Sequence, residues 1–105
     1  MKEFLDLKGA SGAEYRFRAW PEGAHHLPIA GNYVYLRVDD EGRFKVVLVG
    51  ATNDLSQARG EWNKVARRGA THVFTRLNVA RAVRLAEHED LVASYKPALV
   101  SEGAG

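Results

Sequence analysis

Alternation of polar and apolar positions is clearest between residues 14 and 20. Tyr15, Phe17 and Ala19 fall on one side of an extended chain and charged residues fall on the other. This period of two is typical of a strand with one solvent-facing side. A glycine-rich link joins it to the short apolar run Glu3–Leu7. We therefore predict an N-terminal β-hairpin.

A second pair of runs, rich in β-branched and aromatic residues, covers Asn32–Val38 and Arg43–Val49. The polar segment between them, residues 39–42, has the composition of a turn. The second run is apolar on both sides over residues 46–49, which predicts a strand in the interior of the sheet.

The period then changes to that of a helix. The apolar residues at 55, 58, 62, 65 and 66 fall within an arc of about 100° on a helical wheel. Residues 55–66 are therefore predicted to form an amphipathic helix. Residues 71–78 have the pattern of a strand, and a second helix is predicted over about 79–96, before Pro97. The order of elements indicates an α+β fold, with a small mixed or antiparallel sheet, two packed helices and the N-terminal β-hairpin.

Length and composition fit one globular domain. The chain has 105 residues, of which 46% are hydrophobic and 27% charged, close to the average of folded domains. We divide it into an N-terminal hairpin and loop (1–28), a core (29–100) and a loose tail (101–105). No apolar run reaches the roughly 20 residues of a membrane helix, and the charged start is unlike a secretory signal. These features favour a cytoplasmic location without a membrane partner.

The charge is unevenly distributed along the chain. The net charge is only +2, but residues 57–84 carry seven basic side chains against Glu61 alone. A concentrated basic segment is a candidate surface for a polyanion such as DNA or RNA, and a solvated helix face is the alternative. The candidate nucleic-acid-binding residues are Arg59, Lys64, Arg67, Arg68 and Arg76. The chain has no cysteine, which excludes a disulfide framework, a thiolate nucleophile and a cysteine zinc site.

Five short motifs follow one another in order between residues 31 and 99. They are Gly31-Asn32-Tyr33, Leu48-Val49-Gly50, Thr52-Asn53-Asp54-Leu55, Gly69-Ala70-Thr71-His72-Val73 and Leu91-Val92-Ala93-Ser94-Tyr95-Lys96-Pro97. Their order and spacing resemble the GIY-YIG nuclease family. The resemblance implies a GIY-YIG-like α+β core. In active members it also implies two tyrosines near the scissile phosphate, an arginine on the first helix and a glutamate that holds a divalent metal ion.

The resemblance also indicates which catalytic groups this chain lacks. Leu48 stands at the tyrosine of the second motif, Ala58 at the helix arginine and His88 at the metal-binding glutamate. Leucine carries no transferable proton, alanine cannot neutralise a phosphate, and neutral histidine is a poor ligand for Mg²⁺. We therefore predict a degenerate active site without a complete catalytic set. Its positions are Tyr33, Leu48, Gly50, Ala58, Trp62 and His88.

Several of these positions have two interpretations. Arg59 is the nearest substitute for the lost arginine, but it lies one residue after the expected position. On a helix this turns its side chain by about 100°, so the alternative interpretation is an arginine on the surface without a catalytic role. His88 is expected to be a partly buried histidine with satisfied hydrogen bonds and is only a weak candidate ligand for a softer metal. Tyr33 is expected to pack in or beside the core. Trp62 is expected to be buried, whereas an exposed Trp62 would suit stacking on a base or on an apolar partner.

Three functions remain open. The first is a non-catalytic nucleic-acid-binding protein, with DNA favoured and no cofactor required. The second is a divergent DNA endonuclease that uses Mg²⁺ or Mn²⁺ with Tyr33, Arg59 and His88. The third is a protein-interaction module, binding a partner or a second copy through Leu48, Ala58 and Trp62.

Overall fold

Both predicted hairpins are present. In the computed structural model, which describes residues 3–102, β1 (Phe4–Lys8) pairs antiparallel with β2 (Glu14–Ala19), and β3 (Gly31–Val38) with β4 (Phe44–Thr52). Gly12 and Gly42 have φ values of 92° and 81° in the two turns, a backbone region that residues with a Cβ rarely enter. The turn chemistry thus fixes the register of each pair.

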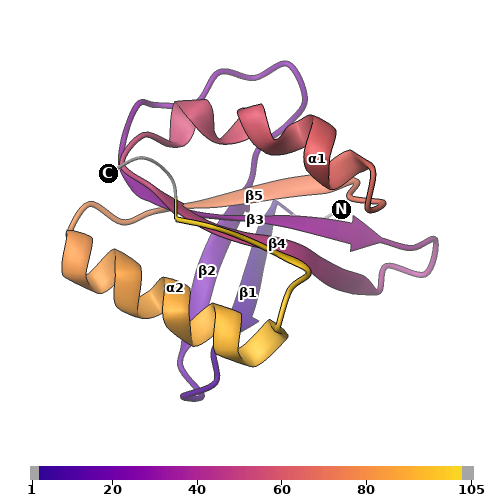
Figure 1. Ribbon diagram of the computed structural model, residues 1–105. Coiled ribbons are helices and arrows are strands. Elements are labelled where there is room, and N and C mark those ends of the chain that lie inside the picture. The colour runs from indigo at the N-terminus through magenta and orange to yellow at the C-terminus, as the bar shows by residue number, and fades with distance from the viewer. Residues whose placement is uncertain (1–2, 103–105) are drawn as a thin grey trace.

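All six strands within residues 3–102 belong to one sheet, in the order β1-β2-β5-β3-β4-β6 (Figure 1). β5 (His72–Leu77) is antiparallel to β2 on one side and to β3 on the other, so the N-terminal hairpin is continuous with the rest of the sheet. β6 (Leu99–Ser101) pairs parallel with β4. The α+β fold and the interior position of β4 are therefore confirmed.

Helices cover the two faces of the sheet from opposite sides (Figure 1). A 3₁₀-helix, η1 (Leu55–Glu61), continues into the short α1 (Trp62–Ala66) on one face, and α2 (Arg81–Tyr95) crosses the other. The prediction of one continuous α-helix over 55–66 is wrong in its first part. Asp54 accepts a hydrogen bond from the Ser56 backbone N–H at 3.0 Å, which caps the start of η1.

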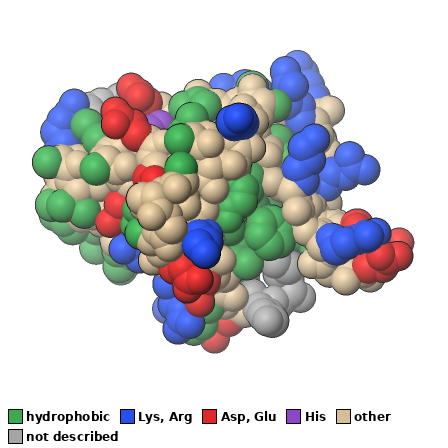
Figure 2. All heavy atoms as spheres, turned by 90° about the horizontal axis from the view of Figure 1, so that it is seen from below, with side chains coloured by type: hydrophobic (Ala, Val, Ile, Leu, Met, Phe, Trp, Pro, Cys, Tyr) green, Lys and Arg blue, Asp and Glu red, His purple; other side chains and the backbone are tan. Residues whose placement is uncertain are grey.

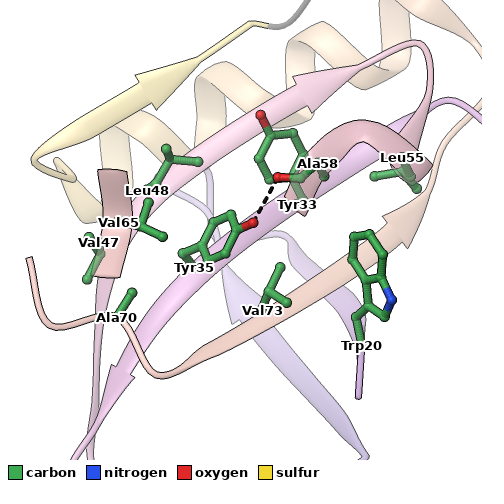
Figure 3. Packing of buried hydrophobic residues seen from close by; sticks show 10 residues of the cluster. All are labelled: Trp20, Tyr33, Tyr35, Val47, Leu48, Leu55, Ala58, Val65, Ala70 and Val73. Atoms are coloured by element: carbon green, nitrogen blue, oxygen red, sulfur yellow. Dashed lines mark hydrogen bonds between the residues drawn. The ribbon is translucent and has the colours of Figure 1, made fainter. Parts of the chain in front are cut away.

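Alternation along the strands divides the core into two clusters. The η1–α1 cluster consists of Trp20, Tyr33, Tyr35, Val47, Leu48, Leu55, Ala58, Val65, Ala70 and Val73 (Figure 3). The α2 cluster consists of Leu7, Phe17, Val34, Leu36, Val46, Val49, Phe74 and Leu91. A β-bulge inserts Val47 opposite the step from Tyr35 to Leu36, so that Val47 and Leu48 both belong to the η1–α1 cluster.

The C-terminal strand β6 was not predicted from the sequence. The loose tail was expected to begin at residue 101, which is wrong for Ser101, because this residue pairs with Gly50 of β4. Residues 103–105 of that tail lie outside the described residues. None of the helices formed by residues 3–102 combines the length and the apolar character that crossing a membrane requires.

Candidate functional site

The two strands that carry the first two motifs lie side by side, with their motif side chains packed against each other. The β3–β4 register pairs Tyr33 with Gly50, and a Cβ added to Gly50 would lie 2.2 Å from a Tyr33 ring atom. Leu48 and Ala58 are buried in the same cluster (Figure 3). The structure thus brings Tyr33, Leu48, Gly50 and Ala58 together. Trp62 lies at the edge of this group, where its ring contacts the ring of Tyr35.

His88 does not join this group. It lies on α2, on the opposite side of the sheet, and is 1% exposed. Neither ring nitrogen has a hydrogen-bond partner among the described residues, and the nearest carboxylate oxygen, on Glu102, is 3.9 Å from Nε2. Burial lowers the pKa of His88, with smaller opposing effects from Glu102 and Glu89. The expected burial is confirmed, but the expected satisfaction of its hydrogen bonds is not.

A carboxylate that the sequence analysis missed lies close to Tyr33. In a 3₁₀-helix, residues three apart are eclipsed, so Glu61 continues the line of Leu55 and Ala58 toward the sheet. Its side chain accepts a hydrogen bond from Ser101 Oγ at 3.1 Å and forms an ion pair with Lys64 at 2.9 Å. A helical wheel drawn with three residues per turn, in place of 3.6, would have shown Glu61 in line with Leu55 and Ala58.

The environment of Tyr33 keeps its hydroxyl protonated. Burial raises the pKa of Tyr33, a hydrogen bond with Ser101 offsets part of this rise, and the nearby charge of Glu61 adds to it. Tyr33 is 2% exposed. It is therefore a neutral, buried phenol at neutral pH and is not placed to deprotonate a water at a phosphate.

Strand β6 closes the outer edge of the motif strands. Ser101 pairs with Gly50 in the parallel ladder and bonds to Glu61, while Leu99 packs against the η1–α1 cluster. Leu48, which stands where the second motif has its tyrosine, pairs directly with Leu99 of β6. The region that the resemblance associates with catalysis is thus covered by the protein itself. Within residues 3–102, no three His, Asp or Glu side chains are grouped to hold a metal ion.

The expectation that Trp62 is buried is wrong, because its side chain is 38% exposed. The three-residue turns of η1 bring Glu61 toward the sheet, so that Trp62, one residue later, is rotated toward solvent. Its ring borders an open pocket of about 500 Å³ shared with Trp20, Arg59 and His72. We call this space the Trp62 pocket.

Arg59 does not replace the missing catalytic arginine. Its Nη2 donates hydrogen bonds of 2.8 Å to the backbone oxygens of Trp20 and Pro21. Its guanidinium also stacks over the Trp20 ring, 4.4 Å from the centroid. These contacts attach η1 to the segment that follows β2. Arg59 therefore holds a wall of the Trp62 pocket in place.

The five predicted nucleic-acid-binding residues do not form one surface. Arg76 donates to Glu87 of α2 at 2.8 Å, which places it on the α2 side of the sheet, away from Arg59. Lys64 is exposed but ion-paired with Glu61. Arg67 and Arg68 are exposed, as expected, and no carboxylate of residues 3–102 lies within 4.0 Å of either.

Two basic residues from outside the predicted segment join Arg67 and Arg68. Arg37 and Lys45 are directly opposed across β3 and β4, and Arg37 lies against Gly69, which follows Arg68. Both are exposed, and neither has a carboxylate within 4.0 Å in the described part of the chain. We call Arg37, Lys45, Arg67 and Arg68 the basic cluster. Figure 2, which views the molecule from the α2 side, shows several Lys and Arg side chains toward the end that carries the β3–β4 turn, beside Asp and Glu side chains at the same end.

A second, larger open pocket of about 800 Å³ lies over β1, β2 and β5. Arg16 and Arg18 line it together with apolar side chains such as Phe4. Each arginine is ion-paired, Arg16 with Asp6 at 2.9 Å and Arg18 with Glu3 at 3.0 Å. Because these charges are already compensated, this pocket is a weaker candidate for a polyanion than the basic cluster.

No family model matches the sequence, and the comparisons with curated proteins and with solved structures also give no match.

Proposed function

We propose that this chain is a nucleic-acid-binding domain without nuclease activity, built on a core whose sequence motifs resemble the GIY-YIG family. The observation that carries the proposal is the basic cluster. Like charges directly opposed across two strands repel each other, and Arg37 and Lys45 have no carboxylate partner among residues 3–102 to relieve this. A bound phosphate backbone supplies the missing negative charge.

The expected mode of binding is contact with phosphates. Arginine and lysine side chains bind phosphate oxygens without reading the base sequence, so the domain binds many sequences with similar affinity. DNA is the favoured partner, the cytoplasm is the proposed location, and the mode requires no metal or cofactor. Lys64 lies within one helical turn of Arg67 and can join the contacts, at the cost of its exposed ion pair with Glu61.

The test is a binding titration of labelled duplex and single-stranded DNA from about 50 to 200 mM salt. We expect log affinity to fall linearly with log salt, by about 0.9 per duplex phosphate contact. The double substitution Arg67→Gln with Arg68→Gln should weaken binding and reduce the slope on duplex by about 2.

The matched control is Arg16→Gln with Arg18→Gln. It removes the same number of charges, but both of these arginines lie on β2 and are already ion-paired with Asp6 and Glu3. Binding by this control should stay close to that of the unmodified protein. Equal losses in the two double variants, an affinity independent of salt, or no binding at about 50 mM salt would each contradict the proposal.

The alternative of a divergent endonuclease is tested on the same DNA with Mg²⁺ and with Mn²⁺. Burial of Tyr33 beneath η1 and β6 favours no cleavage. Cleavage that Tyr33→Phe abolishes would instead establish a nuclease that uses this tyrosine. The protein-interaction alternative receives less support, because Leu48 and Ala58 are buried and only Trp62 of its three apolar positions is exposed.

A further inference from the structure

We propose that the Trp62 pocket binds an unstacked base of a single-stranded nucleic acid whose phosphates lie on the basic cluster. This inference rests on the proposed function and specifies the form of nucleic acid that the domain prefers. It starts from Trp62, a large aromatic side chain that this fold leaves 38% exposed. Aromatic rings at such positions stack on bases of any sequence, because every base has a π-face.

The Trp62 ring is held in place from behind. Tyr35 is fully buried in the η1–α1 cluster, and its ring centroid lies 6.0 Å from that of Trp62 at an angle of 43°. The Tyr35 hydroxyl donates a 2.8 Å hydrogen bond to the backbone oxygen of Ala58, which fixes this support (Figure 3). A ring supported in this way loses little conformational freedom when a base stacks on it.

The opposite wall of the pocket is also rigid. The Trp20 indole N–H donates to the backbone oxygen of Ala24 at 2.8 Å, and the Arg59 guanidinium is stacked on the Trp20 ring. The pocket volume of about 500 Å³ lies within the range of small-molecule sites. It is large enough for one base and too small for a paired duplex, whose bases are stacked and closed to side chains of this kind.

Polar groups at the rim suit the edge of a base. Glu22 and His72 both line the pocket. Thr71 Oγ1 lies 2.7 Å from His72 Nδ1, which leaves the other ring nitrogen directed away from Thr71. The Glu22 carboxylate offers acceptors to base amino groups, and the free ring nitrogen of His72 accepts or donates according to its tautomer. Glu22 does not repel a base, which is uncharged.

The pocket and the basic cluster are adjacent along the chain and in space. Trp62 begins α1, and Arg67 follows it by five residues, which is about 8 Å along a helix axis and about 140° around it. On the other side, Thr71 lines the pocket two residues after Gly69, the residue against which Arg37 packs. One strand can therefore place a base on Trp62 while its neighbouring phosphates contact the arginines.

The experiment compares a labelled single strand of about 12 nucleotides with the duplex of the same sequence. The unmodified protein should bind the single strand more tightly. Trp62→Ala should lower single-strand affinity by about 5- to 150-fold, the range for loss of one base–aromatic stack, and change duplex affinity by less than about 2-fold. Trp62→Phe, which keeps a stacking ring, should retain most of the single-strand affinity.

Tryptophan fluorescence supplies a second readout. Single-strand binding should quench the emission of the unmodified protein, and Trp62→Phe should lose the part of this quenching that comes from Trp62 and keep only the part that comes from Trp20, which is 7% exposed and also lines the pocket. Unchanged single-strand affinity in Trp62→Ala, or equal losses on single strand and duplex, would overturn this inference but leave the proposed function intact. Absence of binding to both DNA forms by the unmodified protein would overturn both.

Discussion

The two faces of the sheet differ in how completely a helix covers them. The 15-residue α2 packs across one face, above a cluster that extends from Leu7 in β1 to Val49 in β4. The η1–α1 segment on the other face is shorter and leaves the outer parts of β2 and β5 open. Both pockets described above lie on this second face, whereas a third, more open pocket of about 640 Å³ lies beside α2, between Tyr15, Val83 and Asp90. Both faces carry a buried cluster, and they differ in how much of the sheet their helices leave open.

Buried polar atoms without a hydrogen-bond partner occur on both faces. Within residues 3–102 they are Arg59 Nε on the η1–α1 face, and Arg84 Nε and both ring nitrogens of His88 on the α2 face. An unsatisfied buried polar group costs about 1–3 kcal/mol. His88 differs from the two arginines because neither of its ring nitrogens is hydrogen-bonded, whereas each guanidinium donates hydrogen bonds through another nitrogen.

The largest expected effect is the loss of stability on removing Phe74, which is fully buried in the α2 cluster. Phe74→Ala should lower the free energy of unfolding by about 3–5 kcal/mol, since it removes a large side chain and leaves a cavity. Trp62→Ala on the other face should cost markedly less, because its ring is partly solvated already. Urea unfolding of both variants measures this, and equal losses would show that the Trp62 ring contributes as much to stability as the buried Phe74 ring.

Gly50→Ala tests how tightly the motif strands are packed. The added Cβ would meet the Tyr33 ring at 2.2 Å, and this ring is enclosed by the η1–α1 cluster. We expect a loss of about 1–3 kcal/mol in unfolding free energy, as for other overpacked cores. Gly60→Ala is the matched control, because a Cβ at Gly60 meets no atom within 4 Å. A Gly50→Ala variant as stable as this control would contradict the packing described here.

The smallest expected effect is the pH dependence that comes from His88. Burial lowers its pKa in the folded protein below the ordinary value of 6.5. The unfolded chain therefore binds more protons below that pH, so the stability contribution is complete above about pH 6.5 and is lost as the pH falls. The slope from one proton is at most about 1.4 kcal/mol per pH unit.

His88→Leu should remove this slope, and it should preserve or increase stability at neutral pH because it replaces an unsatisfied polar group. The measurement is the unfolding free energy of both proteins between about pH 5.5 and 7.5, compared as a difference so that shared carboxylate effects cancel. A difference that does not change with pH would show that the His88 pKa is not lowered in the folded state.

Much of the fold could be predicted because its signals are local. The alternation in β2, the two-sided apolar run in β4 and the end of α2 before Pro97 depend only on neighbours in sequence. β6 could not be found in this way. It has three residues, and its reason for being a strand is its parallel pairing with β4, about fifty residues earlier in the chain.

The candidate site could be predicted only in part. The sequence correctly indicated exposed Arg67 and Arg68 and the apolar character of Leu48 and Ala58. It did not place Arg37 beside the two arginines, because that contact depends on the return of the chain after α1 to the end of β3. Basic residues far apart in sequence were therefore missed.

The amino-acid sequence by itself determined the fold class, the hairpins and the absence of the polar groups that the family resemblance associates with catalysis. Only the tertiary structure decided which charged side chains have an ion-pair partner, because ion pairs such as Arg76–Glu87 form between segments that are distant in sequence. It also decided the exposure of Trp62, since the 3₁₀ geometry of η1 turns Glu61, rather than Trp62, toward the sheet. Residue type is local, whereas availability to a ligand depends on what the rest of the chain covers.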